Sequence, residues 1–87
     1  MRKIVRYVLK EGENRISMPF TSIVVMGGNV ADEMSVWVET DTSEKENTDR
    51  VFFVVKEGGE IDEGMEVDWI GVAVPMNNDS FLIGEVL

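Results

Sequence analysis

The sequence predicts an all-β domain: a small antiparallel barrel or sandwich of about seven strands, with no substantial helix. Short segments in which apolar residues alternate with polar ones, or occupy both faces, recur along the chain. Gly, Pro, Asn and Asp residues separate these segments at short spacing. No segment repeats its apolar residues with the period of a helix. With 87 residues, of which 44% are apolar and 29% charged, residues 1–87 are predicted to form one domain.

The predicted strands are residues 3–9, 14–18, 22–30, 34–40, 50–56, 66–74 and 80–87. The first two strands alternate clearly, and their predicted core-facing residues are Val5, Tyr7, Leu9, Ile16 and Met18. Residues 11–14 between them have the composition of a turn. Pro19 is expected to end the pairing of the second strand, because proline has no amide hydrogen to donate.

The third strand is apolar on both faces and contains the adjacent residues Gly27 and Gly28. Adjacent glycines within a strand indicate a bulge or a close approach of two backbones. A phosphate-binding loop is the weaker alternative, because neither a helix pattern nor Lys-Ser/Thr follows. Residues 31–33 supply a hairpin turn into the fourth strand, where Trp37 lies on the more polar face. Trp37 is therefore a candidate contact residue, although a Trp that partly covers a sheet edge is commoner.

Residues 41–49 form the only wholly polar run, which predicts an exposed, mobile loop with at most one helical turn. The fifth strand, residues 50–56, is again apolar on both faces. We assign Phe52 and Val54 to its second face, which is not the core face.

Residues 57–64 form a glycine-punctuated loop with four carboxylates within seven residues. Carboxylate oxygens suit a cation such as calcium, but the spacing does not fit an EF-hand, and a solvated loop is the preferred interpretation. The sixth strand begins as an alternation and becomes apolar on both faces from Trp69 onward. Residues 75–79 are the predicted final turn, and the glycosylation pattern at Asn78 carries no weight without a secretory signal.

The charge distribution argues against binding to nucleic acid. The net charge is −9, and residues 57–87 contain eight acids and no base, whereas five of the eight basic residues lie within residues 1–15. A phosphate backbone would be repelled by such a chain. Two interpretations stay open: a soluble surface with a basic first strand beside an acidic neighbour, or an acidic surface that meets a basic protein partner.

The residue content also argues against catalysis and cofactors. The chain has no cysteine and no histidine, so thiolate metal sites and the commonest general base are excluded. Paired carboxylates are formally available among the 17 acids, but no catalytic constellation is recognisable. We predict a protein that is not an enzyme and uses no cofactor or metal. No membrane segment or signal peptide is recognised, which predicts a cytoplasmic location, with a virion as an alternative.

Several short motifs follow one another through nearly the whole chain: Arg2–Tyr7, Ile16–Pro19, a strand containing Gly28, Val36–Asp41, Arg50–Phe52, Gly58–Asp62, Trp69–Val74 and Glu85–Val86. In this order they resemble a family of small phage and prophage proteins of unknown function. The resemblance implies a phage or prophage origin and a compact β domain, and it carries over no activity and no site. The chain departs from the family's pattern at two places. It has Gly58–Glu60 where the family often has Gly-His-Pro, and it has residues 31–33 where the family has an Asn-Gly hairpin turn.

The second apolar face of the strands predicts that the chain acts by contacting other protein. Leaving this face in water would forgo on the order of 10 kcal/mol, comparable to the stability of a whole domain. The candidate interface residues are Trp37, Phe52, Val54, Trp69, Ile70, Val72, Val74 and Leu82. We expect a homo-oligomer, most simply a dimer, with a host or phage protein as a further partner. Replacing Ile70 or Val72 with Asp is expected to give a soluble monomer.

The sequence leaves one structural alternative and two functional alternatives open. Closure of a barrel, together with the loop of residues 41–49, could cover the second face within one chain. A virion or assembly component is a second function, in which contacts between copies are the function itself. A protein that sequesters a small anionic ligand is a third, supported only by the basic first strand.

Overall fold

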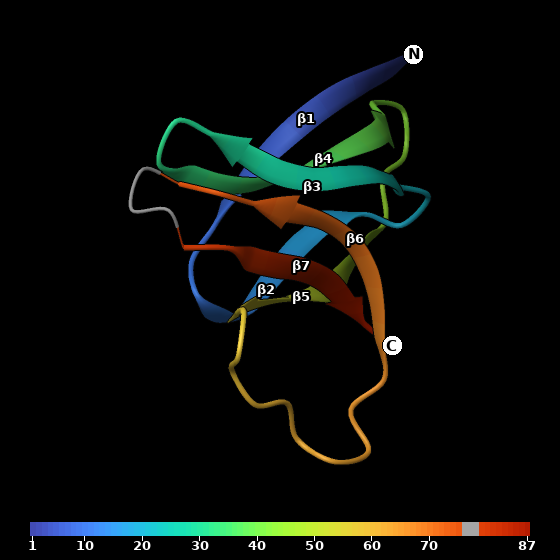
Figure 1. Ribbon diagram of the computed structural model, residues 1–87. Helices are drawn as coiled ribbons and strands as arrows, with labels where there is room; N and C mark the ends of the chain where they lie inside the picture. Colours follow the sequence, from blue (N-terminus) through green and yellow to red (C-terminus); the bar gives the residue numbers. More distant parts are fainter. Residues whose placement is uncertain (76–78) are drawn as a thin grey trace.

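In the computed structural model, residues 1–75 and 79–87 are described, and these residues form seven strands and no helix (Figure 1). The strands are β1 (Arg2–Leu9), β2 (Gly12–Pro19), β3 (Ile23–Val30), β4 (Glu33–Asp41), β5 (Asn47–Lys56), β6 (Val67–Ala73) and β7 (Phe81–Val86). The predicted all-β class is confirmed. Residues 76–78 of the predicted turn at residues 75–79 lie outside the described residues. Asn78, the first residue of the glycosylation pattern, is one of them.

The strands form one curved, nearly closed sheet in the order β1-β4-β3-β6-β7-β5-β2. Neighbouring strands are antiparallel except β3 and β6, which are parallel. The architecture is therefore the barrel-like alternative. β1 and β2 are the two edges, although only Lys10 and Glu11 separate them in the chain. An open seam between these two strands keeps the barrel from closing.

The core lies on the concave face of this sheet. Its buried residues are Leu9, Met18, Val36, Val38, Phe52, Val54, Ala73, Phe81 and Ile83. Leu9 and Met18 thus lie where the alternation of their strands predicts them, and Tyr7 and Ile16 pack against the same cluster. The assignment of Phe52 and Val54 to an outward face is wrong, because both are buried in the core.

The polar loop predicted over residues 41–49 is too long. Asp41 belongs to β4, and residues 47–49 begin β5, where they pair with residues 17–19 of β2. Backbone hydrogen bonds make a ladder whatever the side chains are, so a polar segment can extend a strand at an edge. At the end of β4, Asp41 accepts hydrogen bonds from the backbone amide and hydroxyl of Ser43, which lower the pKa of the Asp41 carboxyl.

The two halves of the sheet are paired in register at two glycines, and the Asn29 side chain adds hydrogen bonds to the Val74 backbone. Gly27 of β3 faces Gly71 of β6 in the only registered pair between these strands among the described residues. A Cβ on Gly71 would lie 2.0 Å from the carbonyl oxygen of Gly27, so glycine is required there. The predicted close backbone approach at the glycines of β3 is confirmed, whereas the bulge of this strand lies earlier, at Val25. A second irregularity lies at Ile70 of β6.

Candidate interaction surface

The convex face of the sheet carries an unusual number of exposed apolar side chains. Strand alternation places even-numbered residues of β1 outward, and the register sets them against Ser35, Trp37 and Glu39 of β4. The next strands continue this face through β3 and β6 to β7. The apolar side chains that are 40–59% exposed on these strands are Ile4, Val8, Ile23, Val25, Met26, Val30, Val72, Trp69 and Leu82. Together with the half-buried Trp37, and with Val74 just after β6, they define the outer apolar face.

A hollow of about 300 Å³ lies within the outer apolar face, over β1, β4 and β3. It is lined by Ile4, Val25, Met26, Gly28, Asn29 and Trp37. Gly28 provides the floor: a Cβ built on it would lie 3.5 Å from Cζ3 of Trp37 and 3.8 Å from the carbonyl oxygen of Val72. None of the lining residues carries an ionisable side chain, so an apolar group would enter without meeting a buried charge.

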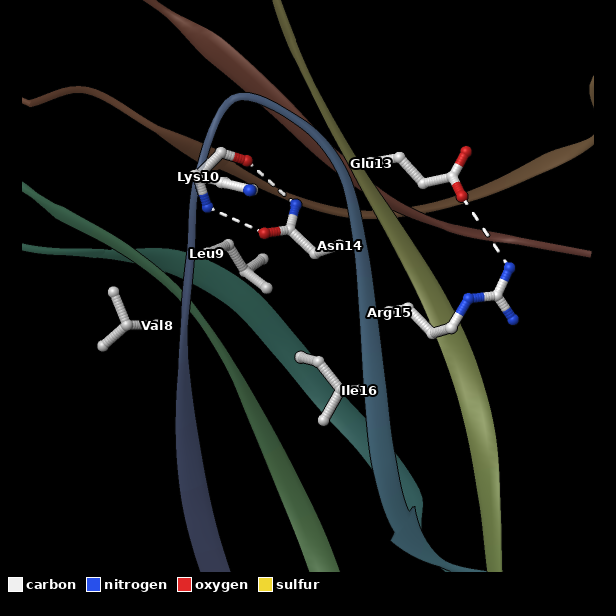
Figure 2. A pocket seen from close by; sticks show the side chains of 7 residues that line it. All are labelled: Val8, Leu9, Lys10, Glu13, Asn14, Arg15 and Ile16. Atoms are coloured by element: carbon white, nitrogen blue, oxygen red, sulfur yellow. Dashed lines mark hydrogen bonds and ion pairs between the residues drawn. The ribbon is translucent and has the colours of Figure 1, made fainter.

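A second cavity, of about 430 Å³, lies at the seam where β1 turns into β2 (Figure 2). The Asn14 side chain spans this turn: the Lys10 amide donates to its Oδ1 at 2.9 Å, and its Nδ2 donates to the carbonyl oxygen of Lys10 at 2.9 Å. Nδ2 also donates to the carbonyl oxygens of Gly12 and Phe52. One amide side chain thereby supplies hydrogen bonds that a neighbouring strand would otherwise make. We assign the seam cavity to the architecture of the sheet.

Replacing Asn14 with Ala is expected to lower the free energy of unfolding by about 1–3 kcal/mol, because the two part-buried hydrogen bonds from Nδ2 to the carbonyl oxygens of Gly12 and Phe52 are lost, each worth roughly 0.5–1.5 kcal/mol. For a chain of this size, each kcal/mol corresponds to a fall in Tm of roughly 4–8 °C. Thermal unfolding followed by circular dichroism measures this change. Glu13→Ala on the same strand is the control, since its ion pair with Arg15 at 3.9 Å is exposed. An unchanged Tm for Asn14→Ala would show that the amide does not hold the seam.

A bidentate ion pair closes the interior of the barrel at one end. Nε and Nη2 of Arg50 donate to the two carboxylate oxygens of Glu85, the second at 2.7 Å. Nη1 of Arg50 donates to the carbonyl oxygen of Ser22 at 2.7 Å, so the guanidinium joins β5 and β7 to the turn before β3. The hydrogen bond to Glu85 raises the pKa of Arg50 above its ordinary value. Both side chains are mostly buried, which makes this pair structural.

Two of the three basic side chains of β1, and the amino terminus before it, have acidic partners on β4. Arg2 pairs with Glu39 at 3.3 Å, Arg6 pairs with Glu33 at 3.5 Å, and the amino terminus pairs with Asp41 at 3.5 Å. These are the neighbours that the basic first strand was expected to have. These pairs reduce the positive charge that β1 could offer to a small anionic ligand.

The structure separates the predicted interface residues into two groups. The residues that lie on the outer apolar face are Trp37, Trp69, Val72, Val74 and Leu82. Phe52 and Val54 are core residues, and Ile70 is partly buried against the core cluster. Ile70 stands at the irregularity of β6, which interrupts the strict alternation of that strand.

Sequence reasoning missed the outward residues on β1 and β3: Ile4, Val8, Ile23, Val25, Met26 and Val30. The signal for β1 was present, since assigning Val5, Tyr7 and Leu9 to the core leaves Ile4 and Val8 outward. The positions of Val25 and Met26 depend on the bulge, because Val24 faces Val38 whereas Met26 faces Trp37, and Val25 is the extra residue. No pattern in the sequence marks that position.

Within residues 1–75 and 79–87, no group of three or more acidic side chains is placed to hold a metal ion. No helix in the same part of the chain has the length and apolar character needed to cross a membrane.

Comparison with known proteins gives one match. A family model described as a domain of unknown function (DUF7352) matches residues 1–82. A search of curated proteins found no match. A search of solved structures found none either.

Proposed function

Since the chain belongs to the DUF7352 family, whose function is unknown, we propose from its surface that it acts without catalysis, by binding protein and by associating with itself. The observation that carries the proposal is the outer apolar face, which runs over adjacent strands and contains Met26, Trp37 and Val72. A contiguous exposed apolar surface of this kind is typical of a protein-binding site.

The size of the outer apolar face matches what an interface needs. Fully burying a Val, Leu or Ile side chain stabilises by roughly 1.5–3 kcal/mol, at about 25 cal/mol for each Å² of apolar surface. Such a side chain therefore has roughly 60–120 Å² of apolar surface to bury. Nine side chains that are 40–59% exposed therefore offer on the order of 400 Å². A standard interface buries about 800 Å² on each partner, of which somewhat more than half is apolar. Most of the apolar part of one such interface is available on this face.

The charge distribution favours self-association through this face rather than through the loop between β5 and β6. That loop and the start of β6 carry six carboxylates between residues 57 and 68 and no base. Figure 1 shows the loop projecting from the opposite end of the molecule from the amino terminus of β1. Two copies that meet at the outer apolar face can keep these like charges apart, and the loop remains free for a basic protein partner.

We place this activity in an infected or lysogenic host cell, as a phage or prophage accessory protein that binds and blocks a host protein. This part of the proposal is supported by the motif order that resembles such proteins and by the acidic, compact domain. The same surface would serve a virion component, so the two settings are distinguished by asking whether the protein is retained in purified particles.

Replacing Val72 with Asp is expected to give a folded monomer, whereas replacing Ile70 with Asp is expected to destabilise the fold. Val72 is 53% exposed, so a carboxylate there stays in water in the monomer but would be buried unpaired in a dimer. Ile70 packs against the core, so its replacement exposes the core to a charge. Analytical ultracentrifugation over a range of concentrations measures the mass, and circular dichroism measures the fold.

Ile61→Asp provides the matched control, because Ile61 is also exposed but lies in the acidic loop. This variant should keep the mass of the unaltered chain. A chain that sediments as a monomer at every concentration would refute self-association. A Val72→Asp variant with an unchanged mass would move the interface elsewhere.

A further inference from the structure

We propose that two copies of this chain join by a two-fold axis through the outer apolar face, with Val25 and Met26 of each copy filling the hollow beside Trp37 of the other. The proposal rests on the proposed function, because it specifies the contact through which self-association occurs. It commits to a second copy as the occupant of the hollow.

The hollow exists because Gly28 has no side chain. Gly28 pairs with Ser35 of β4, lies diagonally across from Trp37 on the convex face, and lies beside the Val72 carbonyl of β6. A larger residue at this position would stand in the space that the Trp37 ring borders. The backbone does not demand glycine here, since Gly28 is not among the residues with positive φ. The absence of a side chain therefore creates an opening in the surface and serves no turn.

The protrusion stands directly beside this opening. The bulge in β3 sets two residues of β3 against one residue of β4, and it leaves Val25 and Met26 both outward, 55% and 52% exposed. A methionine side chain is unbranched and adapts to an irregular apolar cavity. The bulge thus leaves an adaptable, exposed apolar pair at the rim of an apolar hollow.

A protrusion and a matching hollow on one surface are self-complementary. In a two-fold interface each copy presents the same patch, so the protrusion of one copy meets the hollow of the other, and the reverse contact follows by symmetry. None of the residues that line the hollow has an ionisable side chain. Although the chain has a net charge of −9, two copies can therefore meet at the hollow without bringing like charges together there. A basic partner, by contrast, would be attracted to the acidic loop at the other end of the molecule.

The decisive variant is Gly28→Val, which fills the hollow from within. The nearest atoms to the added Cβ lie at ordinary contact distance, and the hollow of about 300 Å³ offers space for the γ-methyl groups, so the monomer should still fold. The dissociation constant of the dimer should rise at least about tenfold, because the partner's side chains lose their place. Met26→Thr, which shortens one of the two side chains that enter the partner's hollow, should also raise the dissociation constant. Ile61→Ser is the control and should leave the dissociation constant unchanged.

Fluorescence reports directly on the hollow. The chain has two tryptophans, so Trp69→Phe leaves Trp37 as the single tryptophan reporter. As the concentration of Trp69→Phe rises through the dimer range, Trp37 emission should shift to shorter wavelength, and Gly28→Val should abolish the concentration dependence. A dimer that tolerates Gly28→Val, with Trp37 emission indifferent to dimerisation, would overturn this contact while leaving self-association in place. A chain that stays monomeric up to millimolar concentration would overturn both.

Discussion

Gly71→Ala is expected to abolish the fold under conditions in which the unaltered chain is stable. The added Cβ would lie 2.0 Å from the carbonyl oxygen and 2.5 Å from the carbonyl carbon of Gly27. Both are backbone atoms, so no change of rotamer relieves the overlap, and β3 and β6 must separate. This pair, together with the two hydrogen bonds between the Asn29 side chain and the Val74 backbone, joins β1, β4 and β3 to β6, β7, β5 and β2. We expect a loss of at least about 4 kcal/mol, a large fraction of the ~5–15 kcal/mol typical of a domain.

Gly28→Ala is the matched control, because the same methyl group is added to β3 at the residue that follows Gly27, the partner of Gly71. Its nearest neighbour would be Cζ3 of Trp37 at 3.5 Å, an ordinary contact, so the free energy of unfolding should change by less than about 1 kcal/mol. Urea unfolding followed by tryptophan fluorescence measures both variants. If Gly71→Ala unfolds within 1 kcal/mol of the unaltered chain, the close packing of these two backbones is not what joins the halves.

Arg50→Met should lower the free energy of unfolding by about 2–4 kcal/mol, because breaking a buried ion pair leaves its partner uncompensated. The Glu85 side chain is only 14% exposed, and it would lose both of its hydrogen bonds from the guanidinium. The Ser22 carbonyl would lose its donor as well. Methionine keeps an unbranched apolar stem in place of the Arg50 stem, so the main loss is of charge and hydrogen bonds. The expected fall in Tm is on the order of 15 °C.

A double variant separates this effect from a simple loss of packing. Arg50→Met combined with Glu85→Leu should recover part of the stability, because an apolar pair can replace a buried ion pair at little cost. Arg2→Met serves as the exposed control: the side chain of Arg2 is 72% exposed, and its loss should change stability by no more than about 0.5 kcal/mol. A single variant at Arg50 that melts like the Arg2 control would show that the pair is not part of the structural framework.

The sequence predicts the class of fold well, because strand alternation and turn chemistry are local properties. The inward residues of β1 and β2 follow from alternation alone, since each of these edge strands has one clearly apolar face. The strand ends at Asp41 and Asn47 do not follow, because ladder pairing with another strand extends a segment that is locally polar.

β5 shows where alternation fails. Both of its faces are apolar, and the choice between them depends on which face turns toward the centre of a sheet that only the whole chain defines. Val51 and Phe53 are partly buried on the convex side, and Val55 is covered there by the turn at Gly59, so apolar residues occur on both sides for different reasons. The same ambiguity misplaced Phe52 and Val54 among the candidate interface residues.

The sequence predicts that an outer apolar face exists, but it predicts only some of the residues on it. Val72, Val74 and Leu82 follow from a surplus of apolar strand residues over what one core can hold. Val25 and Met26 do not, because a bulge changes which residues point outward and depends on how β3 fits against β4. The residues that shape the hollow are therefore those that a periodic pattern cannot identify.

The link between β1 and β2 limits how the sheet can deform. The two rims of the sheet are consecutive in the chain, and Leu9 and Gly12 can be no more than about 11 Å apart across the two residues that separate them. A sheet whose first and last strands are tethered at one end cannot flatten without breaking that tether. If the seam widens, β1 and β2 must therefore stay close at Lys10 and separate most at the other end, between the amino terminus of β1 and Pro19.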